Sequence, residues 1–577
     1  MKRKNYSKHW ELLAITITII VVLVFSINLI LSSILSNSIN NHLETFNSTS
    51  NKEIKVGKIT LNIWTGTLTV KDISIVPDSS LFEQLKNGRL KQMSIMEINI
   101  PLLRFSKLGL YKIFSEHNLS LNKILLRGVE FISYKNDLNV NVEDDKSKLS
   151  LDSIYIEGLE SINLNNIDFE LFSYTTIDVK TNDTIFSLQG NSFEIDGLAL
   201  EKTTNSDNYF VLNTEKLALK MQQQRINLSN ANYFIALNQL DFYYDTGAIN
   251  ASGFTLKPSV DKYKLGGSYK YTKEVFDVEV KSINVFGYKA AKALKHGVID
   301  IDSVLVDGLK LGIYKDRHLP FNLDNRPLFL QQKLKALKQP LHIKNIRISN
   351  SDFDFELRVE ESEDLLKVDI ENISGNIDFL TSIKDSLQSG KKLAIDIKGI
   401  LMDASPLHVN IIMPYNSPVD SFYFSGELGS GDFAKFNQAL YPATGIKFNG
   451  GRLNSLKFYA HANPNAAVGQ MTMLYNDLEA EISKKASGER SNFLSFGANT
   501  VLRVSNPSKK GKTRTSIAKT DRVAYKGFGN LLWKTVQSGL INSILPMGKS
   551  HNEEKNTKES KKRRETKRSK KINNYPY

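Results

Sequence analysis

The feature that most constrains the fold is an alternation of apolar and polar residues that runs from about Lys55 to Lys484. Short runs such as Ile59-Leu61-Ile63 and Phe353-Phe355-Leu357 show it, with Asn, Asp, Gly and Ser between them. Successive side chains of a β-strand point to opposite faces, so this pattern predicts a mainly β fold of half-buried antiparallel strands. Four stretches interrupt it and could be helices or loops: 81–90, 102–114, 288–295 and 328–337.

The phase of the alternation changes at particular glycines. Ile124 and Leu126 are even-numbered, whereas Phe131, beyond Gly128, is odd-numbered, and the same change occurs at Gly308. One extra residue at a β-bulge or tight bend returns the following side chains to the original face. We therefore expect each strand to keep one apolar face across these glycines.

The sequence also repeats. Thr65-Gly66 recurs as Thr246-Gly247, and Asp168-Phe169-Glu170-Leu171 recurs unchanged as residues 354–357. Four such blocks occur in the same order, which a composition merely rich in Ile, Asn and Leu does not easily explain. We predict two β repeats, 55–235 and 236–415, and a third β segment, 416–505, without these landmarks. Repetition of one β unit builds an elongated sheet.

The N-terminus carries a long apolar segment. Residues 12–35 contain no charge and would form a helix of about 36 Å, against a hydrocarbon core of about 30 Å. The apolar region of a cleaved signal peptide is shorter, so we predict an uncleaved transmembrane anchor. Lys and Arg residues precede the segment, and the next basic residue is Lys52. The positive-inside rule then puts residues 1–11 in the cytoplasm and, after a linker at 36–54, the body outside.

The C-terminal region divides into two parts. Within 506–548 we predict a linker and an amphipathic helix, because the apolar residues of 525–545 fall near helical spacing; the helix could lie on a membrane surface or pack on the body. Residues 549–577 hold eleven Lys or Arg against four Glu and should be a disordered basic tail. The tail could meet anionic headgroups or lipopolysaccharide, or stay solvated. The body is only mildly basic, so nucleic acid is not an expected partner.

Motifs for chemistry are missing from the sequence. The chain has no cysteine, and its nine histidines show no metal-ligand spacing. Gly511-Lys512-Thr513 resembles the end of a phosphate loop, but residue 506 is Asn where that motif needs its first glycine. Acidic runs such as 143–145 are most simply solvated loops. We predict no enzyme, no catalytic residues, no cofactor and no metal.

Several segments share an order of strand, glycine and strand: Val56–Ile75 soon after the anchor, Leu121–Phe131, Val304–Ile313, and Gly450–Phe458 followed by Gly469–Leu478. These segments resemble the AsmA-like family. The resemblance covers about 45–485 and rests on the repeated order of a strand, a glycine and a second strand. Relatives of the family include TamB and YhdP and, more distantly, the bridge-like lipid transfer proteins, which form long β troughs with a hydrophobic inside.

The resemblance implies a fold, a place and a function. The fold would be an elongated, twisted antiparallel sheet forming an open groove from repeated units, with one N-terminal transmembrane helix and a few short helices. The protein would be a single-pass inner-membrane protein, with its N-terminus in the cytoplasm and its body in the periplasm. It would bind or conduct phospholipid acyl chains along the groove and contribute to outer-membrane lipid homeostasis.

The apolar strand face has to be covered by another layer, by closure, or by a ligand, and the sequence leaves these open. The alternative function is a non-enzymatic structural or assembly factor for outer-membrane protein biogenesis, which would bind envelope proteins by strand addition. For the lipid hypothesis the candidate groove residues are Ile73, Ile75, Ile124, Leu126, Ile154, Ile156, Val304, Val306, Ile346 and Ile348.

Overall fold

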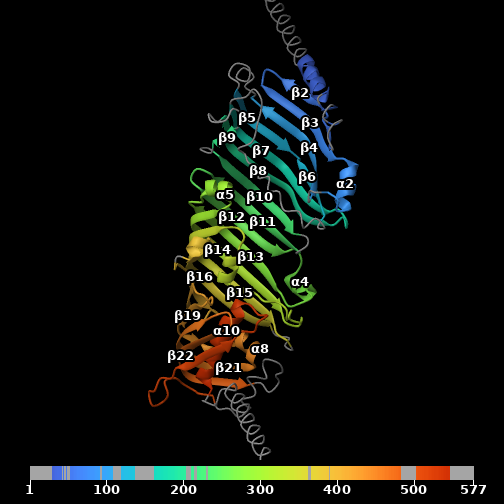
Figure 1. Cartoon of the computed structure of the whole chain (residues 1–577). Coiled ribbons are helices and arrows are strands. Elements are labelled where there is room, and N and C mark those ends of the chain that lie inside the picture. The colour runs from blue at the N-terminus through green and yellow to red at the C-terminus, as the bar shows by residue number, and fades with distance from the viewer. Residues whose placement is uncertain are drawn as a thin grey trace, which may run out of the picture. The chain divides into compact units, whose positions relative to one another are not determined.

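The structure, a computed structural model, is mainly β, and its strands belong to one large mixed sheet (Figure 1). It describes residues 29–41, 43–44, 47, 52–90, 94–107, 118–136, 161–202, 210–213, 217–228, 232–360, 365–388, 390–482 and 502–545. Candidate residues Ile154 and Ile156, the basic tail and most of the predicted anchor therefore lie outside the described residues. In the described ranges, no helix is both long and apolar enough to cross a membrane.

The chain divides into two compact units. Unit 1 comprises Met1–Tyr269, Glu274–Tyr314 and Gln339–Ser351, and unit 2 comprises Lys270–Lys273, Lys315–Lys338 and Asp352–Tyr577. The predicted boundary between the two β repeats, at 235/236, falls inside unit 1, so the repeats stay a prediction. Their local structures agree: Gly66 and Gly247 end four-residue turns with φ values of 61° and 62°.

Unit 1 is built from strands that lie side by side. They are β1 (Lys52–Lys55), β2 (Ile59–Asn62), β3 (Thr67–Pro77), β4 (Ser94–Ser106), β5 (Asn118–Arg127), β6 (Glu130–Lys135), β7 (Ser161–Asp178), β8 (Thr184–Lys202), β9 (Phe210–Asn213), β10 (Ala218–Leu228), β11 (Tyr233–Tyr243), β12 (Ala248–Pro258), β13 (Glu274–Phe286), most of β14 (Ile299–Asp316) and the first part of β15 (Leu341–Arg358). Pairing follows the order β3, β4, β5 with β6, β7, β8, β10, β11, β12, β13. β1 and β2 pair with β3, and β9 pairs with β8.

The expectation of a wholly antiparallel sheet is wrong at one place. β5 and β6 both pair with β7 in parallel. A parallel pair needs a connection of about a dozen or more residues, and 137–160 between β6 and β7 supplies that length. Alternation within a strand does not report the direction of its neighbour, so the sequence pattern could not reveal this pair.

Several strands bend at residues with a left-handed backbone, as the changes of phase predict. Gly308 has a φ of 66° within β14, and Gly128 has a φ of 73° in the short break between β5 and β6. Non-glycine residues take the same conformation in other strands, including Asp72 in β3 and Gln223 in β10. This conformation inserts the extra residue that keeps the following side chains on the original face.

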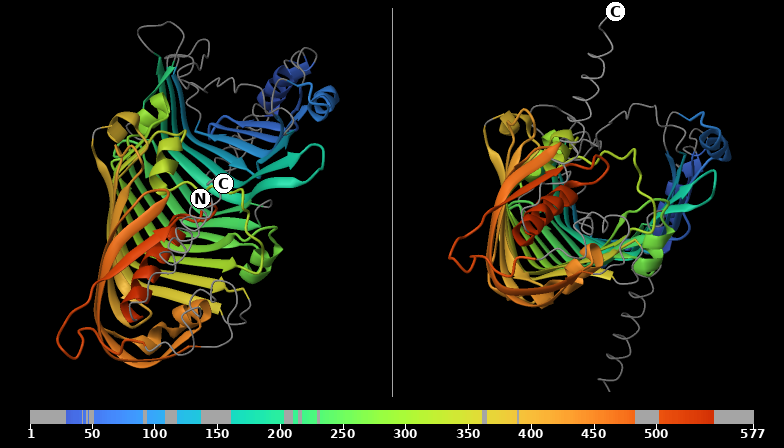
Figure 2. Two further views of the ribbon diagram at one scale, coloured as in Figure 1. Left: turned by 60° about the horizontal axis from the view of Figure 1, so that its bottom comes forward. Right: turned by 90° about the horizontal axis from the view of Figure 1, so that it is seen from below.

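The short helices of unit 1 lie at the ends of strands (Figures 1 and 2). They are α2 (Ser79–Lys86), α4 (Lys262–Ser268) and α5 (Ala290–His296). α2 and α5 fall in stretches expected to be helices or loops, as does α6 (Leu330–Ala336) of unit 2. In the fourth such stretch, Leu102–Ser106 is the end of β4, because these residues pair with β3 and β5.

Unit 2 is an antiparallel meander covered by helices. Its strands are β16 (Leu365–Thr381), β17 (Lys392–Leu401), β18 (Ser405–Pro414), β19 (Phe422–Leu428), β20 (Gly431–Asp432), β21 (Ile446–Ala462), β22 (Ala466–Ile482) and β23 (Ser516–Asp521). The helices are α7 (Lys384–Gln388), η4 (Phe433–Phe436), α8 (Asn437–Thr444) and α10 (Phe528–Ile544). Figure 2 shows α10, in red, lying against one face of the orange strands.

The prediction of a linker and an amphipathic helix within 506–548 is partly wrong. The helix exists as α10, and its residues join two buried apolar clusters on the sheet, so it packs on the body. The segment before it is not only a linker, because β23 pairs with β22 from Ser516 to Asp521. This strand was missed because its sequence, SIAKTD, has too few apolar residues to show the alternation.

Candidate functional site

The pairing of strands in unit 1 aligns apolar residues into rows that cross the sheet. Three rows each take one residue from β3, β4, β5 or β6, β7, β8, β10, β11, β12 and β13. Row A is Val70, Leu103, Leu126, Phe169, Phe193, Met221, Leu240, Ala251 and Ile283. Row B is Leu68, Phe105, Ile124, Ile167, Ile195, Leu219, Phe242, Ile249 and Val285. Row C is Ile75, Ile98, Phe131, Tyr174, Leu188, Ile226, Ile235, Leu256 and Val278.

These rows lie on one face of the sheet. Rows A and B are two residues apart on every strand, and side chains two apart share a face. A ring cluster joins row C to row A: Phe172 contacts Phe131 and Phe193, both with ring centroids 5.5 Å away, and Phe169 at 6.1 Å. Phe169 and Phe193 stack at 4.4 Å. We call the surface formed by rows A, B and C the apolar face.

The apolar face is only half-buried. Among its 27 residues, Val70 and Val285, each 8% exposed, are the two buried ones, and the others are all half-buried. Neighbouring strands cover the sides of these residues, but a packed second layer would bury their tips as well. Large contiguous apolar surfaces that stay exposed are rare on soluble proteins, and those known are typical of protein, membrane or ligand interaction sites.

The opposite face is polar. The residues between rows A and B are Thr69, Arg104, Leu125, Asp168, Glu194, Lys220, Asp241, Asn250 and Asn284, of which Leu125 alone is apolar. Ion pairs cross this face, such as Lys123 Nζ to Asp168 Oδ2 at 2.7 Å and Lys220 Nζ to Asp196 Oδ2 at 2.6 Å. Hydrogen bonds to these carboxylates raise the pKa of both lysines, so both stay charged at neutral pH. An apolar ligand therefore has one face of unit 1 to bind.

The apolar side of unit 2 differs because it is covered. Two clusters of buried residues fill it, and α10 contributes Leu531 to one cluster and Ile544 to the other. Leu393, Met413 and Phe422 are 0% exposed. The same type of strand pattern thus gives a closed core in unit 2 and a half-exposed face in unit 1.

The candidate residues from the sequence fall mostly on or beside the apolar face. Ile75, Ile124 and Leu126 are members of the rows, and Ile73 pairs with Ile100 next to Ile75. The sequence alone did not single out the ring cluster of Phe131, Phe169, Phe172 and Phe193. The change of phase within each strand indicates that these residues lie on its apolar face, but only the pairing of the strands shows that they contact one another.

The later candidates extend the apolar face to β14 and β15. Val304 is buried in a small cluster with Val285 of row B, and Val306 and Ile346 pack against this cluster together with Ile249 and Ile283. Ile348, also on β15, is half-buried.

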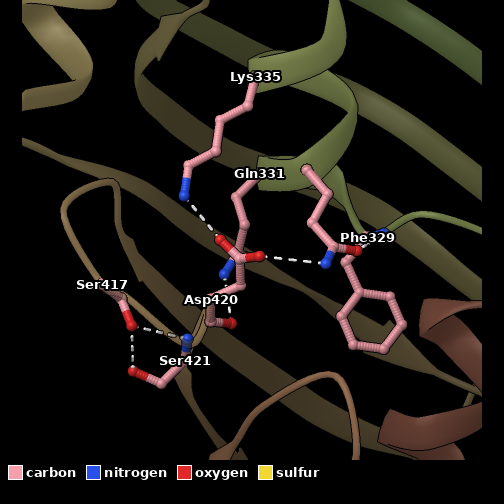
Figure 3. A network of polar contacts seen from close by, with 7 residues as sticks. Phe329, Gln331, Lys335, Ser417, Asp420 and Ser421 are labelled. Atoms are coloured by element: carbon pink, nitrogen blue, oxygen red, sulfur yellow. Dashed lines mark hydrogen bonds and ion pairs between the residues drawn. The ribbon is translucent and has the colours of Figure 1, made fainter.

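A polar network in unit 2 is the strongest candidate for other chemistry (Figure 3). Lys335 Nζ lies 2.6 Å from Asp420 Oδ1, Gln332 donates to Asp420 Oδ2 at 3.1 Å, and buried Gln331 donates to the Asp420 carbonyl. These bonds hold α6 so that Phe329, at its start, fills the core at 0% exposure. The role of the network is therefore structural: it attaches α6 to Asp420, just before β19.

A depression of about 460 Å³ brings Lys335 and Ser417 to one surface. Serine activation by lysine needs a neutral amine bonded to the hydroxyl. Here Lys335 is paired with Asp420, and the Ser417 hydroxyl bonds Ser421 at 2.8 Å. In the part of the chain that the structure describes, no group of three or more His, Asp or Glu side chains is placed to hold a metal ion.

No protein-family model matches this sequence, and no curated protein matches it.

Proposed function

We propose that this chain is a membrane-anchored envelope protein that binds phospholipid acyl chains along the apolar face of unit 1, and that it thereby contributes to outer-membrane lipid homeostasis. The observation that carries the proposal is the set of three apolar rows, which cross nine strand positions and stay half-exposed.

The dimensions of the rows suit acyl chains. Eight intervals between strands of about 4.8 Å each give rows of about 38 Å. The acyl chains of one leaflet fill half of a hydrocarbon core of about 30 Å, which is about 15 Å. Each row is therefore more than long enough for one chain lying across the strands.

The chemistry of the rows predicts the kind of binding. Burial of one methylene is worth about 0.8 kcal/mol, so an acyl chain gains affinity from many weak contacts rather than from one residue. Headgroups would remain in water at the margin of the apolar face. Binding should thus be diffuse and select weakly among headgroups.

Membrane attachment is the second part of the proposal. The last residues of the predicted anchor at 12–35 belong to a helical stretch at 29–41. Ser32, near the end of the predicted anchor, bonds the edge strand β2, because the Leu61 N–H donates to Ser32 Oγ at 2.8 Å. An anchor joined this closely to the sheet would hold the first strands of the apolar face near the source of lipid. The resemblance to AsmA-like proteins supports the same arrangement.

The alternative, strand addition to the sheet edge, has less support. Leu61 of β2 is bonded through both its N–H and its carbonyl to Ser32, and Ile54 of β1 is bonded in the same way to the side-chain amide of Asn47. A partner strand would have to displace these bonds.

Paired variants on opposite faces test the proposal. Ile226→Asp with Ile249→Asp puts two charges on the apolar face, and Asn227→Asp with Asn250→Asp puts two charges at the adjacent positions on the polar face. The first pair should abolish phospholipid copurification and photocrosslinking of the full-length chain, and the second should leave both unchanged. Equal lipid recovery from the two folded variants, or none from the unmodified chain, would overturn the proposal.

A further inference from the structure

The side chains of the unit 2 sheet become small beneath α10. One row runs through Ile411, Phe424, Ala460, Gly469 and Ala518, so its side chains shrink to Ala and Gly on β21, β22 and β23. Ala460 is 3% and Ala518 1% exposed. Small side chains here let a helix approach the strands closely, whereas the three rows of unit 1 contain one residue as small as these, Ala251.

The buried side of α10, which packs on this row, also has small residues. Thr535, Gly539 and Ser543, spaced four apart, are all buried. A Cβ atom on Gly539 would lie 2.9–3.1 Å from side-chain atoms of Met471, so a larger residue at that position would press on Met471. The hydroxyls are satisfied: Ser543 Oγ bonds Ser516 Oγ at 2.8 Å, and Thr535 donates to a carbonyl of its own helix. The helix and the sheet are fitted to each other.

α10 also occupies the edge of the last strand. The Lys519 N–H donates to Ser538 Oγ at 3.3 Å, and Asn542 Nδ2 donates to the Ile517 carbonyl at 2.8 Å. β23 pairs with β22 on its other side. These two backbone groups are therefore not available to a further strand, and one helix covers both a face and an edge.

We infer that α10 is a terminal cap: it closes the apolar face of unit 2 and the free edge of β23, so that lipid binds along unit 1 and not beneath α10. The lipid part of this inference rests on the proposed function, and the closed edge stands without it. An acyl chain and α10 cannot occupy the same area of the sheet, and the close fit around Gly539 makes the helix the occupant.

Two methionines allow a matched test in the full-length, membrane-inserted chain. A diazirine analogue of methionine would be placed either at Met221, in row A, or at Met471, which is 0% exposed beneath α10. Both probes keep the shape of the natural side chain. After irradiation we expect a phospholipid adduct from the probe at Met221, and a cross-link to α10 without any lipid adduct from the probe at Met471.

Variants then release or lock the helix. Gly539→Leu forces α10 away from Met471 by overpacking and should produce a lipid adduct at Met471, whereas Gly529→Leu on the same helix, with open space around Gly529, should not. Because the chain has no cysteine, Ser516→Cys with Ser543→Cys gives a single disulfide that fixes α10 to β23. In the oxidised variant, a probe at Met471 should form no lipid adduct. Hydrogen exchange of the Lys519 amide should become faster in Gly539→Leu and in no other variant.

The outcomes separate the two proposals. Lipid adducts at Met471 in the unmodified or oxidised chain would overturn the cap and leave lipid binding intact. No lipid at Met221 in any variant would overturn the proposed function and the lipid part of the inference, while protection of the Lys519 amide and a cross-link from Met471 to α10 would still support the closed edge. If Gly539→Leu fails to fold, the disulfide variant replaces it: a lipid adduct at Met471 in the oxidised form would overturn the cap, and its absence would support it.

Discussion

Phe172 is the best position at which to separate stability from lipid binding, because it lies at the centre of the ring cluster. Its ring contacts those of Phe131, Phe169 and Phe193. We compare Phe172→Leu, which removes the ring and stays apolar, with Phe172→Asp, which also adds a carboxylate. Each aromatic pair is worth about 0.5–1.5 kcal/mol, so loss of the three pairs should cost each variant roughly 1.5–4.5 kcal/mol, towards the lower end because the cluster is half-buried. Phe172→Asp should lose more than Phe172→Leu, because it also gives up the apolar burial that Leu keeps.

Lipid binding should distinguish the two variants. An acyl chain over the new Asp side chain has to desolvate its carboxylate, and the large cost of a buried charge drives that group to take up a proton. The neutral, unpaired polar group that remains still costs at least about 1–3 kcal/mol in proteins. That cost corresponds to roughly 5–150-fold weaker binding, whereas Phe172→Leu offers the chain another apolar surface.

The assay is the amount of phospholipid per protein after purification of the full-length chain in detergent, measured by mass spectrometry beside thermal unfolding of both variants. If Phe172→Asp retains as much lipid as Phe172→Leu while both variants are folded at the assay temperature, acyl chains do not lie on this face and the reasoning fails.

Two further predictions concern stability. Burial raises the pKa of Tyr415 to about 12, so the folded state favours the neutral phenol. The stability linked to this shift is fully present below pH 10, and roughly 2–3 kcal/mol of it is lost as the pH rises through 12. Tyr415→Phe should remove this fall in the free energy of unfolding above pH 10, measured by denaturant titration. It should also cost about 1–3 kcal/mol at pH 7, because the Phe379 carbonyl and the Thr381 N–H lose their partner. An unchanged dependence on pH would contradict the assignment. Gly247→Ala should cost more than the roughly 1–2 kcal/mol of a left-handed residue, since its Cβ would collide with the Tyr288 carbonyl. Gly190→Ala, equally left-handed but in open space, is the control, and equal losses in thermal unfolding would refute the clash.

The sequence predicted part of the candidate site. Ile75, Ile124 and Leu126 were identified from alternation within single strands, and the pairing brings them into rows with residues from strands far along the chain. The ring cluster was missed because Phe131, Phe169 and Phe193 belong to three strands, and their contact depends on register. A shift of one residue in any strand would move its apolar residues to the polar face.

The amino-acid sequence by itself determined that the chain is mainly β, that its strands have one apolar face, and that some of them bend at Gly128 and Gly308. These are local properties, fixed by the two-residue period of a strand and by the freedom of glycine at positive φ. Tertiary structure alone decided the parallel pairing of β7, the alignment of three apolar rows, and the covering of one apolar face but not the other. Those features depend on contacts between residues far apart in the chain, such as Met471 and Gly539, and alternation carries no information about them.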